Sequence, residues 1–105
     1  MRTLRTDKRL QRWFHVSLGG KLKAVTVDVS ELGFCAELAP VFLPGSEVDG
    51  EIRVRDRCFP FKGTVSWAKP GLRTKNQPSR IGVAFRQISG EFATHLYGSV
   101  LAAHA

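Results

Sequence analysis

Two groups of polar residues in this chain have the chemistry to bind an anionic ligand. Arg5 and Arg9 lie four positions apart near the N-terminus, and Asp28, Ser30 and Gly33 follow within the segment Asp28-Val29-Ser30-Glu31-Leu32-Gly33. The planar guanidinium of arginine makes paired hydrogen bonds to phosphate oxygens, whereas lysine offers only a point charge. Because side chains two positions apart on a strand share a face, Asp28 and Ser30 are predicted to project together.

The same six residues are also typical of a hairpin turn, because Asp, Ser and Gly are common turn residues. The alternation before them predicts a strand over residues 24–29, with its three valines on one face and Thr26 and Asp28 on the other. Gly33 would permit a positive backbone φ angle or the close approach of another group. Taken alone, these residues leave a turn and a binding motif as two open interpretations.

The order of the motifs resembles the PilZ family, whose domains bind the bacterial second messenger cyclic di-GMP. The arginine pair comes first, then a strand, and then an Asp-x-Ser-x-x-Gly motif that closes a second strand. Gly63-Thr64-Val65-Ser66-Trp67-Ala68 is similar to the family's strand ending in tryptophan, and Arg80-Ile81-Gly82-Val83-Ala84-Phe85 to its late Ile-Gly-Val-x-Phe strand. The resemblance covers nearly the whole chain from Arg5, although Leu32 stands where many members carry a second glycine.

The resemblance implies a mainly β fold: a six-stranded antiparallel barrel with a C-terminal α-helix and a flexible basic N-terminal arm. It also implies that Arg5 and Arg9 hold guanine edges and phosphates, that Asp28 accepts from a guanine N–H edge, and that Ser30 serves a phosphate or ribose oxygen. Gly33 would keep the surface clear of a side chain. A carboxylate beside two phosphates is unfavourable unless it meets a donor, so Asp28 favours guanine over a general anion.

Trp67 has two interpretations. It could stack on a base, as the resemblance suggests. Regular alternation instead places it in the core, because it shares one strand face with four other residues, Phe59, Phe61, Gly63 and Val65. The apolar face favours the core role.

Composition describes one domain of 105 residues, in which residues 1–12 are predicted to be the arm and residues 13–105 the barrel. The formal net charge is +7, and residues 1–12 carry five basic side chains against one acidic, which favours an anionic partner. Such an arm is also typical of a disordered, solvated tail. No apolar run is long enough to cross a bilayer, so we expect a cytoplasmic protein without membrane insertion. Cys35 and Cys58 are expected to be reduced core residues, and the sequence leaves open whether they ever pair.

Other segments complete the expected barrel. Gly19-Gly20 predicts a two-residue hairpin turn, and the clearest alternation of the chain predicts a strand over residues 48–55. Ser89 is a predicted helix cap, with Glu91 in the first turn and the helix closing one opening of the barrel. The apolar stripe of this helix is Phe92, Leu96 and Val100. A basic loop is expected over residues 69–79, and its cationic neighbourhood could be a solvated face or could steer a nucleotide: Lys69, Arg73, Lys75 and Arg80.

The leading functional hypothesis is a cyclic di-GMP receptor whose arm orders on the ligand and creates a surface for a downstream protein. One alternative is a small basic barrel that binds single-stranded nucleic acid, but this would require aromatic and basic side chains together on one strand face. Another is a PilZ-like adaptor without a ligand. The three scattered histidines (His15, His95 and His104) and the absence of triad, phosphate-loop or metal spacing favour neither an enzyme nor a metal or cofactor. A monomer and a homodimer both remain open.

Overall fold

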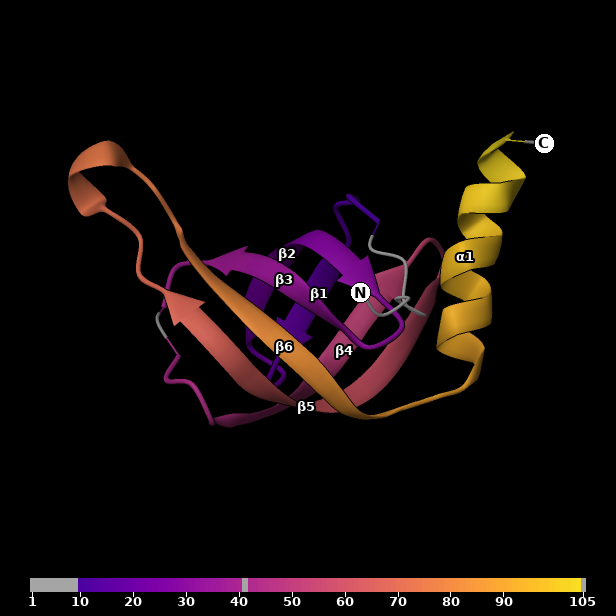
Figure 1. Ribbon diagram of the computed structural model, residues 1–105, viewed down its shortest axis with the longest axis horizontal. Helices are drawn as coiled ribbons and strands as arrows, with labels where there is room; N and C mark the ends of the chain where they lie inside the picture. Colours follow the sequence, from indigo (N-terminus) through magenta and orange to yellow (C-terminus); the bar gives the residue numbers. More distant parts are fainter. Residues whose placement is uncertain (1–9, 41, 105) are drawn as a thin grey trace, which may run out of the picture.

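The computed structural model describes residues 10–40 and 42–104, which form a closed antiparallel barrel followed by one helix (Figure 1). The strands close in the order β1-β2-β3-β6-β5-β4. Their bounds are β1 His15–Leu18, β2 Leu22–Ser30, β3 Gly33–Leu38, β4 Glu47–Val54, β5 Arg57–Lys69 and β6 Ser79–Ile88, and helix α1 spans Glu91–His104. The six-stranded barrel and the C-terminal helix predicted from the sequence are therefore confirmed.

Strand β4 shows most simply how the sequence produces the barrel. Ile52 and Val54 are buried, whereas the intervening Glu51 and Arg53 are exposed, as regular alternation requires. The β1–β2 connection is slightly longer than predicted, because Leu18 pairs with Leu22 across a three-residue loop. Gly19 and Gly20 both have positive φ angles in this loop, which explains the two glycines.

The strand pairings contain three register shifts, one of which makes Arg86 of β6 an extra residue between Phe85 and Gln87. The other two are β-bulges that break the alternation that the sequence predicted. In β2, Thr26 pairs with Ala36 and Asp28 pairs with Cys35, so that Val27 is an extra residue. The prediction that Val25, Val27 and Val29 share one face is therefore wrong: only Val29 is fully buried, and the other two are half-buried. In β5, Ser66 is the extra residue between Val65 and Trp67.

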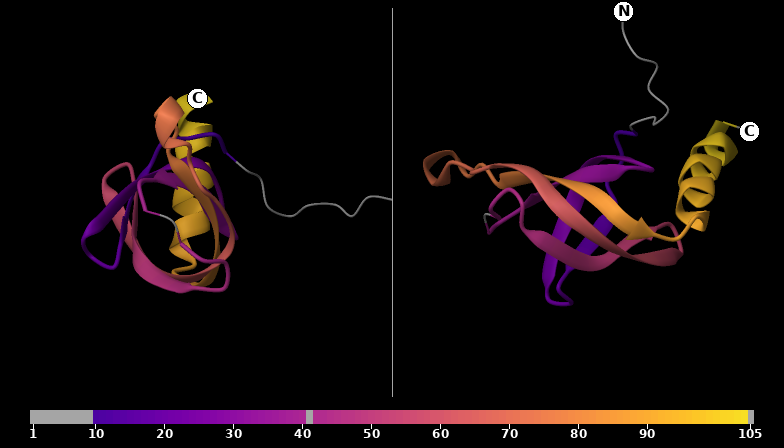
Figure 2. Two further views of the ribbon diagram at one scale, coloured as in Figure 1. Left: turned by 90° about the vertical axis from the view of Figure 1, so that its left-hand side faces the viewer. Right: turned by 60° about the horizontal axis from the view of Figure 1, so that its bottom comes forward.

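The core is a set of aromatic rings packed edge to face along the barrel. Phe34 contacts Phe61 with centroids 5.4 Å apart, Phe61 contacts Phe85 at 5.5 Å, and Phe85 contacts Phe92 of α1 at 5.3 Å. Phe92 also packs against Phe59 at 5.4 Å. Phe92 and Leu96 are fully buried, so α1 closes one opening of the barrel as predicted, and Figure 2 shows it at that end. The side chain of Val100 lies outside the described part.

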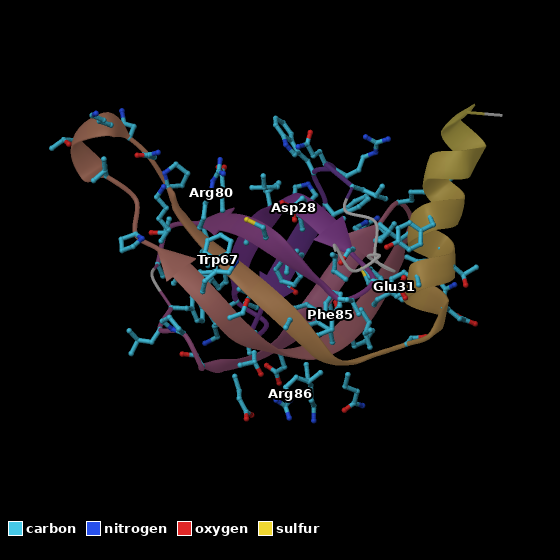
Figure 3. All side chains as sticks on the ribbon, viewed as in Figure 1. Asp28, Glu31, Trp67, Arg80, Phe85 and Arg86 are labelled. Carbon is cyan, nitrogen blue, oxygen red and sulfur yellow. The ribbon has the colours of Figure 1, made fainter. Side chains whose placement is uncertain are left out.

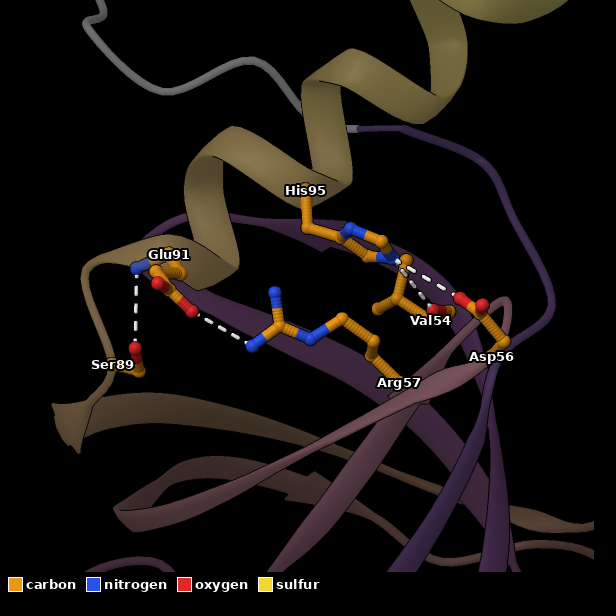
Figure 4. Close-up of polar contacts among 6 residues, drawn as sticks. All are labelled: Val54, Asp56, Arg57, Ser89, Glu91 and His95. Atoms are coloured by element: carbon orange, nitrogen blue, oxygen red, sulfur yellow. Dashed lines mark hydrogen bonds and ion pairs between the residues drawn. The ribbon is translucent and has the colours of Figure 1, made fainter.

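Polar contacts fix the first two turns of α1 (Figure 4). The Ser89 Oγ accepts the amide hydrogen of Glu91 at 3.2 Å, which confirms the predicted cap. Arg57 donates to Glu91 at 2.7 Å, and this hydrogen bond and the charge of Arg57 lower the pKa of the Glu91 carboxyl. His95 lies 3.1 Å from the Val54 carbonyl oxygen, which ties the helix to the β4–β5 hairpin.

The two cysteines of the chain differ in burial. Cys35 is buried, but Cys58 is exposed on β5, so the prediction of two core cysteines is wrong for Cys58, which alternation turns outward next to Phe59. No disulfide joins the two. Among residues 10–40 and 42–104, we find no group of three or more His, Cys, Asp or Glu residues that could hold a metal ion. Within the same ranges, no helix is both long and apolar enough to cross a membrane.

Candidate functional site

A row of four residues crosses the outer face of the barrel from β2 to β5. Asp28 on β2 pairs with Cys35 on β3, Cys35 with Gly82 on β6, and Gly82 with Trp67 on β5. Their neighbours in β2, β3 and β6 belong to the core, so alternation turns the row outward. The row runs through a surface hollow of about 350 Å³ lined by residues 28, 32–35, 66–67 and 82–84, which we call the Asp28–Trp67 hollow.

The Val27 bulge gives Asp28 its position. Thr26 is buried and points into the barrel, so a regular strand would turn Asp28 inward as well. The extra residue reverses this orientation, and Asp28 is half-buried at the edge of the hollow. Part of Asp28 is thus exposed at the outer face, and Figure 3 shows Asp28 and Trp67 on the same side of the barrel, with β3 and β6 between their strands.

The Ser66 bulge does the same for Trp67. The inward-facing Val65 precedes the bulge, and the indole beyond it is 43% exposed on the outer face. The core interpretation of Trp67 is therefore wrong, because it assumed an alternation that the bulge interrupts. The four other residues of the predicted stripe are indeed buried: Phe59, Phe61, Gly63 and Val65.

The motif glycine is required by backbone packing. A Cβ atom on Gly33 would collide with the carbonyl oxygen of Val83 and lie 3.1 Å from the Cα of Ala84. Gly33 pairs with Ser30 across the two-residue turn Glu31-Leu32, so the hairpin interpretation of this segment also holds. Of the two alternatives that the sequence allowed for Gly33, the close approach of another group is the one observed.

Ser30 lies deeper than the predicted ligand contact implies. It is 0% exposed, and it does not line the hollow. The Ser30 Oγ accepts the amide hydrogen of Leu32 at 3.1 Å, and the Tyr97 hydroxyl of α1 accepts that of Glu31 at the same distance. The structure therefore brings Asp28, Gly33 and Trp67 together at the hollow and places Ser30 within the turn beside the helix.

The segment before β1 is bound to β2 next to the hollow. The backbone of Leu10 exchanges two hydrogen bonds with Val29, of 2.8 and 3.0 Å. The buried hydroxyl of Thr26 donates to the Arg12 carbonyl at 2.6 Å and accepts from the Phe14 amide at 2.8 Å. The predicted arginine pair, Arg5 and Arg9, lies outside the described residues.

An ion pair lies on the same outer face, two residues from Cys35 along β3 and two residues from Gly82 along β6. Arg80 donates to Glu37 from Nε at 3.0 Å and from Nη2 at 2.8 Å, and the two residues are cross-strand partners. Cys35, Glu37 and Gly82 were not among the site residues predicted from the sequence, although Cys35 is buried as expected. The missing signal was the strand register, which decides which residues of β3 and β6 lie in line with Asp28.

The comparisons with known proteins agree with this fold. The family model of the PilZ domain matches residues 4–102. No curated protein sequence matches the chain. A solved structure titled "Structure of Bacillus subtilis Inhibitor of motility (MotI/DgrA)" is similar with a TM-score of 0.80 at 14% identity, over 97% of this chain and 52% of that one. The chain thus spans about half the length of this neighbour, and the likeness shows a shared fold.

Proposed function

Because this chain belongs to the PilZ domain family, we propose that it is a receptor for cyclic di-GMP that transmits the level of this messenger to another protein. The observation that supports the proposal most is the joint placement of Asp28 and Trp67 at one hollow on the outer face of the barrel. These are different recognition groups on strands far apart in sequence. A carboxylate and an aromatic ring that line the same hollow suit a planar base that carries donor N–H groups.

Guanine meets both requirements. Its N–H edge donates to a carboxylate, and its faces stack on an aromatic side chain. Asp28 would accept from this edge, and Trp67 would stack on the base. Gly33 lets the β2–β3 turn pack closely on β6. Ser30 would support the turn through its hydrogen bond to Leu32 and would also serve a phosphate or ribose oxygen.

The arginine pair would complete the site from the N-terminal side. Leu10 is hydrogen-bonded to Val29, the residue next to Asp28, and Arg9 directly precedes Leu10 in the chain. An extended chain spans about 3.5 Å per residue, so Arg5 can lie at most roughly 17 Å from Leu10. Both guanidiniums can therefore reach a ligand in the Asp28–Trp67 hollow, where they would bind guanine edges and phosphates.

We propose that binding orders the arm, residues 1–12, across the barrel formed by residues 13–105, and that the ordered arm presents a new surface to a downstream protein. The protein would act in the cytoplasm, as a monomer or a homodimer, and would bind its ligand without metal, cofactor or catalysis. If the arm orders, hydrogen exchange of its amides should slow on saturation with cyclic di-GMP. Unchanged exchange in residues 1–12 would contradict this mechanism while leaving binding itself intact.

Calorimetric titration of the full chain with cyclic di-GMP tests the binding proposal. We expect saturable binding that is lost in Arg9→Ala and strongly weakened in Asp28→Ala. Arg86→Ala is the matched control, because it removes an exposed arginine of β6 that does not line the hollow, and Figure 3 shows Arg86 below the barrel and Asp28 over its upper part. This variant should bind like the unsubstituted chain.

A titration with single-stranded oligonucleotides separates the alternative functions. Oligonucleotide binding with a steep salt dependence, together with no uptake of cyclic di-GMP, would favour the nucleic-acid alternative. No binding in either titration would favour an adaptor that has no ligand.

A further inference from the structure

Trp67 lies against Gly82, its cross-strand partner. A Cβ atom built on Gly82 would collide with the indole Nε1 and lie 2.6 Å from Cε2 and 2.7 Å from Cδ1. All three atoms belong to the five-membered ring of the indole. This ring therefore occupies the space that any side chain at position 82 would require.

A second contact fixes the same place. The hydroxyl of Ser66, the bulge residue, donates to the carbonyl oxygen of Gly82 at 3.1 Å. The bulge that turns Trp67 outward is thus hydrogen-bonded to the residue on which the indole lies. Two independent contacts with one glycine, one polar and one steric, restrict how the tryptophan can be oriented.

Resting on the proposed function, we infer that Gly82 is a positioning residue for recognition of a purine base. Its missing side chain lets the Trp67 indole lie close to β6, at the wall of the Asp28–Trp67 hollow, in an orientation set before the ligand arrives. Preorganisation of this kind reduces the ordering cost of binding. Gly82 acts only through Trp67, and it does not itself contact the ligand.

The two glycines of this face differ in what a side chain would meet. At Gly33 an added methyl group would strike the backbone of Val83, which cannot move without disturbing the sheet. At Gly82 it would strike the ring of Trp67, whose exposed side chain can rotate away. Gly82→Ala should therefore fold normally and displace the indole.

Fluorescence tests the position of the indole without any ligand. Trp13 and Trp67 are the only tryptophans, so Trp67 is observed alone in a Trp13→Phe background. In that background, Gly82→Ala should shift the emission to longer wavelength and increase quenching by acrylamide. Gly98→Ala is the matched control, because a methyl group added there meets no atom of the described residues within 4 Å outside the adjacent helix backbone. If Gly82→Ala left emission and quenching unchanged, the positioning role would be wrong.

A double-mutant cycle with cyclic di-GMP tests the consequence for binding. We expect Gly82→Ala and Trp67→Ala each to raise the dissociation constant about tenfold, which is the scale of one base-stacking contact. The double variant should bind no more weakly than Trp67→Ala alone, because Gly82 acts through the ring. Additive losses, or an unchanged affinity in Gly82→Ala, would overturn this inference and leave the receptor function standing. Absence of binding by the unsubstituted chain would overturn both.

Discussion

Strand β4 and the bulged strands β2 and β5 show two ways in which this sequence uses a pleated sheet. β4 alternates without interruption, and its inward residues fill the core. β2 and β5 each contain one extra residue, Val27 and Ser66, and each bulge lies directly before a residue of the hollow. The regular strand supports the fold, whereas the bulges turn Asp28 and Trp67 outward at the same row.

Both bulges are needed to bring Asp28 and Trp67 to the same hollow. Asp28 and Trp67 are thirty-nine positions apart in sequence, and they meet at one hollow because both strands change orientation at the same level of the barrel. A single bulge would leave one of the two side chains inside. Such re-aiming of side chains is a known use of bulges beside functional sites.

The largest expected effect is on the regular, core-forming part. Phe92→Ala removes ring contacts with Phe59 and Phe85 and leaves a cavity under α1. We expect the free energy of unfolding to fall by about 3–5 kcal/mol, measured by equilibrium urea unfolding. Leu43→Ala, at an exposed apolar residue, is the control and should change it by less than about 0.5 kcal/mol. A small loss in Phe92→Ala would mean that the helix contributes little to the barrel.

The same contrast explains what could be predicted from the sequence. Strand β4 and the Ser89 cap follow from local patterns, namely alternation and side-chain capping, which act over a few residues. The resemblance to a family supplied the strand count and the motif residues. The outward position of Trp67 could not be predicted, because a bulge is an exception to alternation, and no residue type in residues 63–68 marks it.

The side-chain contacts between strands could not be predicted from the sequence for a related reason. The Trp67 indole lies against Gly82, and Glu37 pairs with Arg80, only because β3, β5 and β6 adopt one particular register. A slip of one residue would turn each of these side chains to the other face. Local patterns assign residues to strands, but the pairing of strands is a property of the closed barrel.

A pair of threonine substitutions sharpens the comparison between a bonded and an unbonded hydroxyl in the bulged strands. Thr26, on β2, donates to Arg12 and accepts from Phe14, whereas the buried Oγ1 of Thr64, on β5, has no hydrogen-bond partner within the described ranges 10–40 and 42–104. We expect Thr26→Val to lower the free energy of unfolding by about 1–3 kcal/mol, because two backbone groups lose their partner. Thr64→Val should leave it unchanged or raise it slightly.

Urea unfolding of both variants, with hydrogen exchange of the Phe14 amide, measures the difference. Faster exchange at Phe14 in Thr26→Val alone would show that this hydroxyl holds the segment before β1 against β2. Equal losses in the two variants would instead mean that the contacts of Thr26 with the N-terminal segment add nothing to stability.

The smallest expected effect concerns the ion pair at the start of α1. The hydrogen bond from Arg57 and the charge of that residue lower the pKa of Glu91 in the folded chain, so the pair stabilises the fold above the unfolded carboxyl pKa of about 4.3. This contribution is lost as the pH falls through the lowered folded value. Both side chains are exposed, so salt should weaken the pair further.

Thermal unfolding between pH 7 and pH 3, at low and high salt, measures this contribution. The unsubstituted chain should lose slightly more stability on acidification than Glu91→Gln, and the difference should shrink at high salt. Glu47→Gln, which removes an exposed carboxylate on β4, is the control. A large difference at neutral pH that persists in high salt would mean that charge attaches α1 to the barrel. The burial of Phe92 and Leu96 predicts instead that packing holds the helix, because an exposed pair competes with water and ions whereas a buried ring does not.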